Sequence, residues 1–556
     1  MSIDVSNIEQ LVVANQYAEA IRQLNIAFND IVDPFASQRL EQLKALCLSK
    51  LGDVEDAMNY FEPLWRSHSD RVESAGIMGS IYKSIFIANQ DPKFGKLSAQ
   101  TYLSSYQHTK NYYTGINAAT MSKVSGDYRT AKEIANELIS NSKDSEDDYW
   151  WEASLAEAYL LTNKYDLATE HYLKTRELMG NDWGSVASVN QQLWLINHFS
   201  KVPRSILQVF KLPTIAAFIG HMIDAPNREK PRFAPSMESD VRSAIRSTIV
   251  SNDLQVGFSS LACGADILFV EEMLELKREI SIILPFNKND FRDTSVAFAG
   301  QEWVDRFNNI LERVSNVTYL TKDNYNGNDY FFQFLAEQIV GEAILRAKLQ
   351  RSTPKLFAVI SNLSIESKVG GTRDLLNSWT NKEDVVLVNT DTFLPERKDP
   401  DYYTGISTQN FELQKNRKFA VAISFSDEIS LDELNFEDFS SLIWKGVDQQ
   451  SKILVFGRFN EAIRFIRENK ILLKNMEQSG GGFTWGLYND QLNNVLDHQF
   501  IKDAVKLFQL SNKRLYTLKP VASIMAKRDS RIELEFAGEV ELNNGEMNQA
   551  YRVNIS

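Results

Sequence analysis

The chain has 556 residues, too many for one hydrophobic core, and a typical domain size of roughly 150 residues predicts about three or four domains. Its formal net charge of −13 argues against a general nucleic-acid or anionic-membrane surface, because such surfaces need clustered Lys and Arg side chains. Two cysteines, Cys47 and Cys263, and six scattered histidines argue against a disulfide framework and predict no metal site. The acidic first residues and the lack of a run of about 18 apolar residues predict a cytoplasmic protein without a membrane segment.

Residues 8–200 show a helical pattern in which short polar turns separate paired helices. Such turns occur at 51–53 (LGD), 125–128 (SGDY) and 162–165 (TNKY). Tetratricopeptide repeats (TPRs) have this pattern, with a period of about 34 residues. We therefore expect a TPR-like all-α array over residues 1–205, in which aromatic side chains such as Trp150 and Trp151 pack between repeats. The concave face of such an array is a surface for a protein partner.

Three stretches of this array carry a family resemblance: 73–83 (ESAGIMGSIYK), 112–119 (YYTGINAA) and 148–161 (DYWWEASLAEAYLL). They resemble the TRAFs-binding domain of apoptosis-signal-regulating kinases, which also occurs in bacterial multidomain proteins. The resemblance covers approximately residues 1–200 and implies a role in signalling. No kinase signature follows in the chain, so kinase activity is not implied.

Strand and helix candidates alternate over residues 212–392, which predicts βαβ units and a mostly parallel sheet. The strand candidates are 214–219, 254–258, 280–284, 317–320, 356–360 and 385–388. Three of the loops in this segment contain glycine just before a helix candidate. Ligands of open α/β sheets bind at the carboxyl ends of strands, where glycine permits close backbone approach and helix N-termini attract anions. A nucleotide pocket is therefore expected, and the alternative that the glycines only form tight turns stays open.

The order of these loops resembles that of the SLOG superfamily, which includes the DNA-processing A protein and the Lonely-guy hydrolases. The resemblance implies a Rossmann-like nucleotide-binding domain over residues 212–392. Carried over by position, the nucleotide-binding candidates are Gly220, His221, Asp224, Cys263, Gly264, Asp266, Pro285, Gly370, Gly371 and Thr372. Backbone N–H groups at the glycines are expected to reach phosphate oxygens, and Thr372 adds a hydroxyl group. Asp266 either caps the helix that it begins or accepts a hydrogen bond from a ribose hydroxyl.

Catalysis in this domain has less support than binding. The Lonely-guy hydrolases use a Pro-Gly-Gly-x-Gly-Thr-x-x-Glu motif, and residues 369–375 (VGGTRDL) lack both its later glycine and its glutamate. The catalytic part of the resemblance therefore does not transfer. The remaining weak candidates for acid–base chemistry are His221, Glu271 and Glu272, and only one of the two adjacent glutamates can face a cleft.

Mixed strand and hairpin signals over residues 412–556 predict an α+β domain. Strands are expected at 418–425, 451–457, 483–488, 536–542 and 550–553, a turn before 483, and helices at 431–445 and 460–468. The layout resembles the class III nucleotidyl cyclase homology domain, whose first strand corresponds to residues 419–426 (FAVAISFS) and whose Gly-Asp hairpin falls on 449–450. That family holds two Mg²⁺ ions with two carboxylates, which Val421 and Gln450 cannot replace. A pseudo-cyclase is therefore expected.

The leading interpretation is a multidomain, cytoplasmic, nucleotide-sensing regulatory protein that also binds a protein partner through the array. A hydrolase that cleaves a nucleotide N-glycosidic bond is the alternative, and a scaffold without a ligand is the second alternative. No cofactor is expected apart from the nucleotide, and neither nucleic acid nor membrane is expected as a partner. Homo-oligomer formation stays open.

Overall fold

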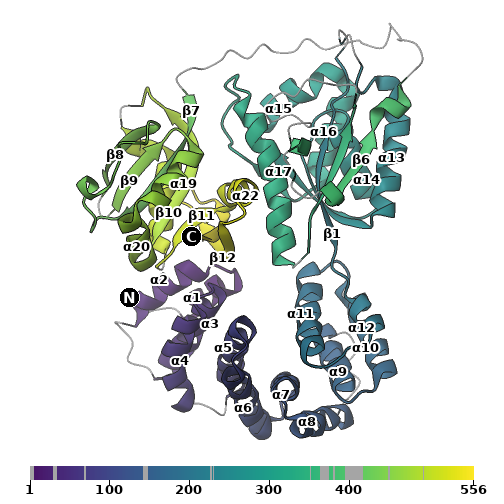
Figure 1. Cartoon of the computed structure of the whole chain (residues 1–556), viewed down its shortest axis with the longest axis vertical. Helices are drawn as coiled ribbons and strands as arrows, with labels where there is room; N and C mark the ends of the chain where they lie inside the picture. The colour runs from purple at the N-terminus through teal and green to yellow at the C-terminus, as the bar shows by residue number, and fades with distance from the viewer. Residues whose placement is uncertain are drawn as a thin grey trace. The chain divides into compact units, whose positions relative to one another are not determined.

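The computed structural model describes residues 5–28, 34–67, 71–141, 148–225, 228, 231–350, 352–362, 375–377, 379, 382–394, 417–448, 451–492, 494–511 and 513–555 (Figure 1). The chain forms two compact units. One comprises Met1–Leu212 with Phe536–Val540, and the other comprises Pro213–Glu535 with Glu541–Ser556. The predicted division into domains 1–205, 212–392 and 412–556 stays a prediction. The second of these and most of the third lie in the same compact unit.

The described residues of the first unit form a succession of antiparallel helices (Figure 1). These are α1 (Val5–Val13), α2 (Tyr17–Ala27), α3 (Pro34–Lys50), α4 (Val54–Ser67), α5 (Val72–Asn89), α6 (Pro92–Thr109), α7 (Tyr112–Val124), α8 (Tyr128–Ser140), α9 (Tyr149–Leu161), α10 (Tyr165–Met179), α11 (Trp183–Phe199) and α12 (Arg204–Val209). Consecutive helices pack in pairs, such as α5 with α6 and α9 with α10, while α7 also contacts α5, α9 and α11. The predicted TPR-like all-α array is confirmed.

Small residues and polar caps explain why these helices form and pack closely. Asn111 begins α7 by accepting hydrogen bonds from the N–H groups of Tyr113 and Thr114, at 3.0 and 3.4 Å. Gly115, inside the YYTGINAA stretch, has no room for a side chain, because a Cβ atom there would lie 2.7 Å from the ring of Tyr106 on α6. A glycine in this position allows α7 to approach α6 at the distance that paired helices need.

A six-stranded parallel sheet begins the second unit. Its strands are β1 (Thr214–Gly220), β2 (Leu254–Ser259), β3 (Glu279–Leu284), β4 (Val317–Tyr319), β5 (Lys355–Ile360) and β6 (Val385–Asn389). Each predicted strand is confirmed to within one residue at either end, and every described pair is parallel. The strand order is β4-β3-β2-β1-β5-β6, so the direction of winding reverses between β1 and β5.

Helices cover both faces of this sheet (Figure 1). They are α13 (Glu238–Ser251), α14 (Ala265–Glu275), α15 (Lys288–Ser295), α16 (Gln301–Arg313) and α17 (Tyr330–Leu349). In Figure 1, α13 and α14 lie on one side of the strands and α17 lies on the other. The core beneath α14 contains Phe218, which stacks on Phe269 with 4.1 Å between ring centroids and meets the edge of Phe357. Strands buried on both faces explain the nearly continuous apolar runs in the sequence.

The rest of the second unit is built on a seven-stranded mixed sheet, with the order β12-β13-β11-β10-β7-β9-β8. The strands are β7 (Arg417–Ser426), β8 (Leu442–Asp448), β9 (Ser451–Phe456), β10 (Gly481–Asn489), β11 (Leu515–Leu518), β12 (Glu533–Glu541) and β13 (Met547–Asn554). The helices are α19 (Phe459–Glu468), α20 (Lys470–Ser479), α21 (Gln499–Leu510) and α22 (Lys519–Arg528). A parallel sheet followed by a mixed sheet agrees with the predicted order of fold classes.

Two local predictions in this part are wrong. The helix expected over 431–445 is replaced by a short 3-10 turn at Leu431–Glu433 and by the edge strand β8, which pairs antiparallel with β9. Pairing with a neighbouring strand decides the structure of such a half-exposed segment more strongly than its local helical pattern does. Of the three glycines expected to form a turn before 483, Gly480 ends α20 with a φ of +86°, whereas Gly481 and Gly482 belong to β10. A Cβ atom on Gly482 would overlap the carbonyl oxygen of Ala504 on α21.

Helix α17 joins the two sheets of the second unit. It packs along α22, where a Cβ atom on Gly341 would overlap the carbonyl oxygen of Ser523. Two ion pairs flank this contact, Lys519 with Glu342 at 3.0 Å and Arg528 with Glu337 at 2.8 Å. The two sheets are therefore held together by a packed interface and not only by the connecting chain.

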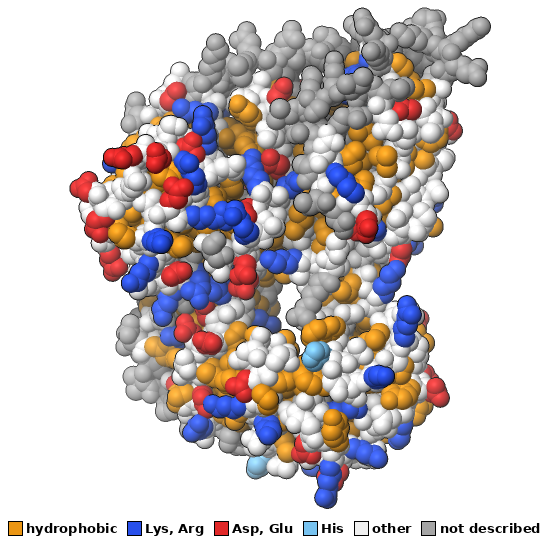
Figure 2. Space-filling view, viewed as in Figure 1, with side chains coloured by type: hydrophobic (Ala, Val, Ile, Leu, Met, Phe, Trp, Pro, Cys, Tyr) orange, Lys and Arg blue, Asp and Glu red, His pale blue; other side chains and the backbone are white. Residues whose placement is uncertain are grey.

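The surface of the described residues carries charges of both signs. Figure 2 shows Lys and Arg side chains interspersed with Asp and Glu side chains on the visible face. Within the part of the chain that the structure describes, no helix combines the length and the apolar character that crossing a bilayer requires.

Candidate functional site

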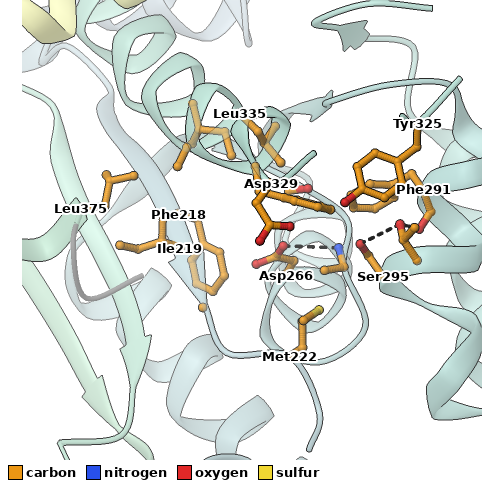
Figure 3. A pocket seen from close by; sticks show the side chains of 17 residues that line it. Phe218, Ile219, Met222, Asp266, Phe291, Ser295, Tyr325, Asp329, Leu335 and Leu375 are labelled. Carbon is orange, nitrogen blue, oxygen red and sulfur yellow. Dashed lines mark hydrogen bonds between the residues drawn. The ribbon is translucent and has the colours of Figure 1, made fainter. Parts of the chain in front are cut away.

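A pocket of about 470 Å³ lies at the carboxyl ends of the parallel strands (Figure 3). The end of β1, the loop after β2, the start of α14, helix α15, the loop after β4 and the first half of α17 all contribute to it. The lining residues are Phe218, Ile219, Gly220, Met222, Ser260, Ala262, Asp266, Phe291, Thr294, Ser295, Tyr325, Asp329, Phe332, Leu335, Ala336, Ile339 and Leu375. Its volume and its position next to the reversal between β1 and β5 are typical of small-molecule sites in open α/β folds.

The described lining is mostly apolar and aromatic, and its charged groups are the two carboxylates of Asp266 and Asp329. No Lys or Arg occurs among the described lining residues. Hydroxyl groups of Ser260, Thr294 and Ser295 add polar contacts. The described part of the lining therefore suits a ring that stacks on aromatic side chains and donates hydrogen bonds to carboxylates, and this part provides no basic side chain for a phosphate.

Asp266 is the most chemically distinctive residue of the pocket. It is the second residue of α14, is only 8% exposed, and accepts a hydrogen bond from the N–H of Ala262 at 3.3 Å. Burial raises the pKa of this carboxyl to about 7, and the N–H of Ala262 only partly opposes that shift. Asp266 therefore changes its protonation state near neutral pH, as an acid–base group or a pH-dependent ligand contact must.

The loop before α14 differs from a phosphate-binding turn. Gly264 has a φ of +104°, and a Cβ atom there would lie 2.5 Å from the backbone nitrogen of Ile223. The N–H of Ala265 donates to the carbonyl of His221 at 3.1 Å, and the N–H of Ile223 donates to the carbonyl of Cys263 at 3.2 Å. The first N–H of α14 therefore already donates to a carbonyl of the protein. Gly264 does not line the pocket.

Other nucleotide-binding candidates near β1 stabilise the loop. The buried carboxylate of Asp224 accepts hydrogen bonds from the N–H groups of Arg232 and Phe233, at 2.7 and 2.8 Å, and forms an ion pair with Arg228 at 3.1 Å. Burial is the main cause of its raised pKa, and these hydrogen bonds and the ion pair oppose it. The Cys263 thiol is fully buried, and burial raises its pKa far above neutrality, so it is not a nucleophile at pH 7.

Several candidates lie near the pocket without lining it. His221 and Pro285 are both buried and follow β1 and β3, whereas Gly220 does line the pocket. Gly370, Gly371 and Thr372 lie outside the described residues. Of the nucleotide-binding candidates, Gly220 and Asp266 line the described pocket, and nucleotide binding by any of them stays a prediction.

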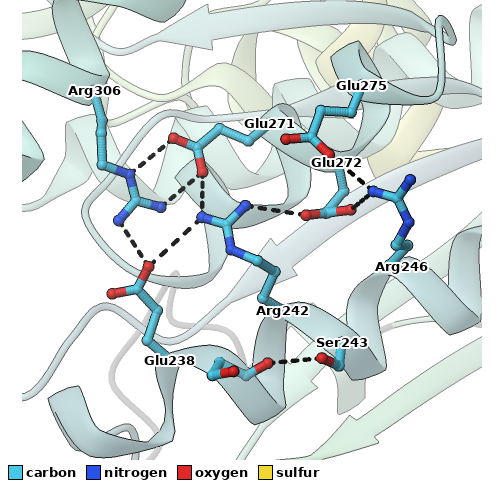
Figure 4. Close-up of polar contacts among 9 residues, drawn as sticks. Glu238, Arg242, Ser243, Arg246, Glu271, Glu272, Glu275 and Arg306 are labelled. Carbon is cyan, nitrogen blue, oxygen red and sulfur yellow. Dashed lines mark hydrogen bonds and ion pairs between the residues drawn. The ribbon is translucent and has the colours of Figure 1, made fainter.

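The two glutamates considered for acid–base chemistry belong to a separate ion-pair cluster (Figure 4). Glu271 pairs with Arg306 at 2.7 Å and with Arg242 at 2.6 Å, and Glu272 pairs with Arg242 at 3.0 Å and Arg246 at 2.7 Å. Burial alone raises the pKa of Glu271, but hydrogen bonds from Arg306 and Arg242 leave it below its ordinary value. Neither glutamate lines the pocket, so the described geometry assigns them to joining α13, α14 and α16.

Sequence reasoning missed the wall of the pocket that α15, α17 and the loop before α17 provide. Phe291, Tyr325, Asp329 and Phe332 come from these segments. One signal was present: the stretch 323–329 (DNYNGND) follows the fourth strand candidate and has the same polar, glycine-containing composition as the other strand-end loops.

Of the two positions compared with the metal ligands of the cyclases, only Val421 lies among the described residues. Val421 is 3% exposed in the central strand β7, paired with Phe456 and Trp485. Gln449 and Gln450 lie outside the described residues. Among the residues that the structure does describe, no group of three or more His, Cys, Asp or Glu side chains could hold a metal ion.

Comparison with known proteins identifies the repeats in the first unit. The model of the Tetratricopeptide Repeats-Sensor family (TPR-S) matches residues 16–122. No curated protein matches the chain. The match supports TPR-like repeats with a protein-interaction or sensor role, and it leaves the SLOG and cyclase resemblances as predictions.

Several solved structures with low sequence identity align with part of the chain. A thermophilic TPR protein from Thermus thermophilus shares 16% identity with a TM-score of 0.28, over 34% of this chain and 97% of that one. A tetratricopeptide repeat protein from Parabacteroides merdae shares 12% identity with a TM-score of 0.27, over 38% of this chain and 79% of that one. The human IFIT1 dimer with PPP-AAAA shares 16% identity with a TM-score of 0.28, over 37% of this chain and 52% of that one.

Proposed function

We propose that this chain is a sensor that binds a nucleotide or nucleotide-derived ligand at the carboxyl edge of its parallel sheet and a protein partner through its TPR-like array. The observation that carries the proposal is the pocket next to the reversal between β1 and β5. Open α/β sheets bind their ligands at this position, because the loops that follow the strands diverge there and leave a crevice.

The described lining favours the base and ribose of such a ligand. Phe291, Tyr325 and Phe332 offer ring faces and edges for a planar base, and Asp266 and Asp329 offer acceptors for ribose hydroxyls or a base amino group. A phosphate gains nothing from these two carboxylates. Nucleosides and weakly charged derivatives should therefore bind at least as well as the corresponding triphosphates.

The test is calorimetry on the full chain with a panel of nucleosides and mono-, di- and cyclic nucleotides, together with mass spectrometry of small molecules released when the purified protein is denatured. Ala336, 9% exposed on α17, lines the pocket, and Ala336→Phe should fill it and weaken binding at least tenfold. Leu349→Phe, at the exposed end of the same helix, is the control. No binding by the wild type would leave the scaffold alternative. Equal binding by wild type and Ala336→Phe would show that the ligand binds outside this pocket.

A second candidate function is hydrolysis of the ligand's N-glycosidic bond. Asp266 favours it, because a pocket carboxyl with a pKa of about 7 can donate a proton to a leaving base at neutral pH. Chromatography of the ligand after incubation with the chain separates the two functions. A hydrolase releases the free base and loses this activity in Asp266→Asn, whereas a sensor returns the ligand intact.

A further inference from the structure

Two carboxylates from different elements meet in the pocket of the parallel sheet (Figure 3). Asp266 is in the first turn of α14, and Asp329 directly precedes α17. In Figure 3 both side chains point into the same part of the pocket. Among the described residues, the buried carboxylate of Asp266 has one hydrogen-bond partner, the N–H of Ala262 at 3.3 Å, although a carboxylate can accept about four hydrogen bonds. It therefore has capacity for a donor on a ligand.

The loop before α17 holds Asp329 at the pocket through Tyr325. The N–H of Tyr325 donates to Oδ2 of Asp290 at 2.7 Å, and its ring stacks on Phe286 with 4.6 Å between ring centroids. Burial raises the pKa of Tyr325, and the charge of Asp329 and its hydrogen bond with Tyr325 raise it further. Tyr325 is thus fixed by the loop and in turn orients the exposed Asp329.

The described surroundings of Asp266 leave its negative charge without a cation. No Lys or Arg is among the described lining residues. Arg306 acts electrostatically on Cys263 in the loop before α14, but its guanidinium pairs with Glu271 at 2.7 Å and with Glu238 at 2.9 Å. Burial raises the pKa of Asp266 to about 7, so the ionised carboxylate is destabilised in the pocket. A positive charge beside Asp266 would stabilise the ionised form.

Aromatic rings supply a second kind of contact for positive charge. Phe291, Tyr325 and Phe332 line the same pocket as the two carboxylates. The face of an aromatic ring attracts a cation, and the attraction is stronger where water is excluded. A planar cation can therefore stack on a ring while its edge donates to a carboxylate. Rings and carboxylates together distinguish a cation from a neutral ring of the same shape.

We propose that the pocket selects a free nucleoside whose base carries a positive charge, such as a base methylated on a ring nitrogen, with the charged edge of the base at Asp266 and Asp329. The inference rests on the proposed nucleotide-binding function and specifies the chemical class of the ligand. A neutral base can stack on the same rings, but it lacks the charge-assisted hydrogen bond to a carboxylate, which is roughly twice as strong as a neutral one.

The test is calorimetry on the full chain at about pH 7.5 with adenosine, inosine, 1-methyladenosine and 1-methylinosine. 1-Methyladenosine is a cation near neutral pH, whereas 1-methylinosine has nearly the same shape and is neutral. Adenosine and inosine are both neutral and differ by the same exchange of an amino group for an oxygen. The affinity ratio of the methylated pair, divided by that of the unmethylated pair, therefore isolates the effect of charge.

This quotient should be about ten or more. Cytidine, uridine, 3-methylcytidine and 3-methyluridine form the corresponding pyrimidine set, because 3-methylcytidine is also a cation near neutral pH. A base of the wrong size lowers all affinities within its set, but the quotient compares like with like. We expect a quotient of this size in at least one of the two sets.

Protein variants locate the recognition of charge. Asp266→Asn keeps the shape of the side chain and should bring the quotient close to one. Asp329→Asn, at an exposed position, should lower it several-fold and remains informative if Asp266→Asn does not fold. Phe332→Leu should also lower it several-fold, because it removes a ring from the lining. The matched control is Asp240→Asn on α13, exposed and outside the described lining, which removes the same charge and should leave the quotient within about twofold.

The inference and the proposed function can fail separately. A quotient close to one in both sets, or a quotient that both Asp266→Asn and Asp329→Asn leave unchanged, rejects the recognition of charge while nucleoside binding itself stands. No binding by any of the eight nucleosides also rejects the inference, and the nucleotide panel described above then decides the proposed function on its own.

Discussion

Substituting Asp266 by Asn should change how the stability of the protein depends on pH. The carboxyl has an ordinary pKa of 3.8 when exposed in the unfolded chain and about 7 in the folded protein, because burial disfavours its charged form. A folded-state pKa that is raised means that the folded state binds the proton more tightly. The resulting stabilisation is complete below about pH 4 and is lost as the pH rises through 7.

The size of this effect follows from the two pKa values. One pKa unit corresponds to about 1.4 kcal/mol, so between pH 5 and pH 8 the wild type should lose roughly 3 kcal/mol that Asp266→Asn does not lose. The Asn side chain can still accept the hydrogen bond from Ala262, and its neutrality mimics the protonated acid. Asp266→Asn should therefore gain stability over the wild type as the pH rises.

The assay is denaturant or thermal unfolding of the full-length wild type and variant at pH values from 5 to 8, with Asp240→Asn at an exposed position of α13 as control. The difference in the free energy of unfolding between wild type and variant removes the contribution of titrating groups that both proteins share. A difference that is constant between pH 5 and pH 8 would refute a raised pKa for Asp266. It would also remove the main support for acid–base chemistry in the pocket.

Three further outcomes are expected. Glu271→Gln should lower the free energy of unfolding by about 1–3 kcal/mol, because it weakens the pairs with Arg306 and Arg242, while ligand affinity measured by calorimetry stays within twofold of wild type. The chain should make no cyclic nucleotide from ATP, GTP, CTP or UTP with Mn²⁺, because Val421 cannot hold a metal, and product in a chromatographic assay would contradict this. Gly341→Ala should lower the melting temperature, because the overlap with Ser523 costs about 1–3 kcal/mol. This cost exceeds the roughly 0.5–1 kcal/mol by which alanine stabilises a helix relative to glycine. A higher melting temperature would show that α17 and α22 separate easily.

The strands of the parallel sheet could be predicted because each is an apolar run bounded by polar or glycine residues, and strands buried on both faces have this pattern. The edge strand β8 could not, because its burial alternates weakly and its strand structure depends on pairing with β9. In the site, Gly220 and Asp266 were identified from strand-end loops, whereas Phe291 and Asp329 were not. Their contribution depends on how α15 and α17 pack over the sheet edge, which no local pattern encodes.

The same limit applies to Glu271 and Glu272. Their place in the sequence, one turn after Asp266, is compatible with a pocket carboxylate, but the side chains on α14 that follow Asp266 by five and six residues point elsewhere around the helix. In that direction they meet Arg242 on α13 and Arg306 on α16, which are distant in sequence, and form ion pairs with them. A carboxylate near a motif is therefore weak grounds for a catalytic role until its partners are known.

Helix α17 connects the pocket to the mixed sheet, because different faces of one helix serve the two. Phe332, Leu335 and Ala336 line the pocket, while Glu337 and Gly341 contact α22. The contact at Gly341 has no spare room, so a ligand that shifts α17 must also change its packing on α22. Coupling of this kind is reciprocal. If the ligand changes the free energy of packing between α17 and α22, a variant that loosens this packing should change the free energy of ligand binding by the same amount. Ligand affinity measured in Gly341→Ala, beside its melting temperature, therefore tests whether the pocket communicates with the mixed sheet, and an affinity equal to that of the wild type would show that it does not.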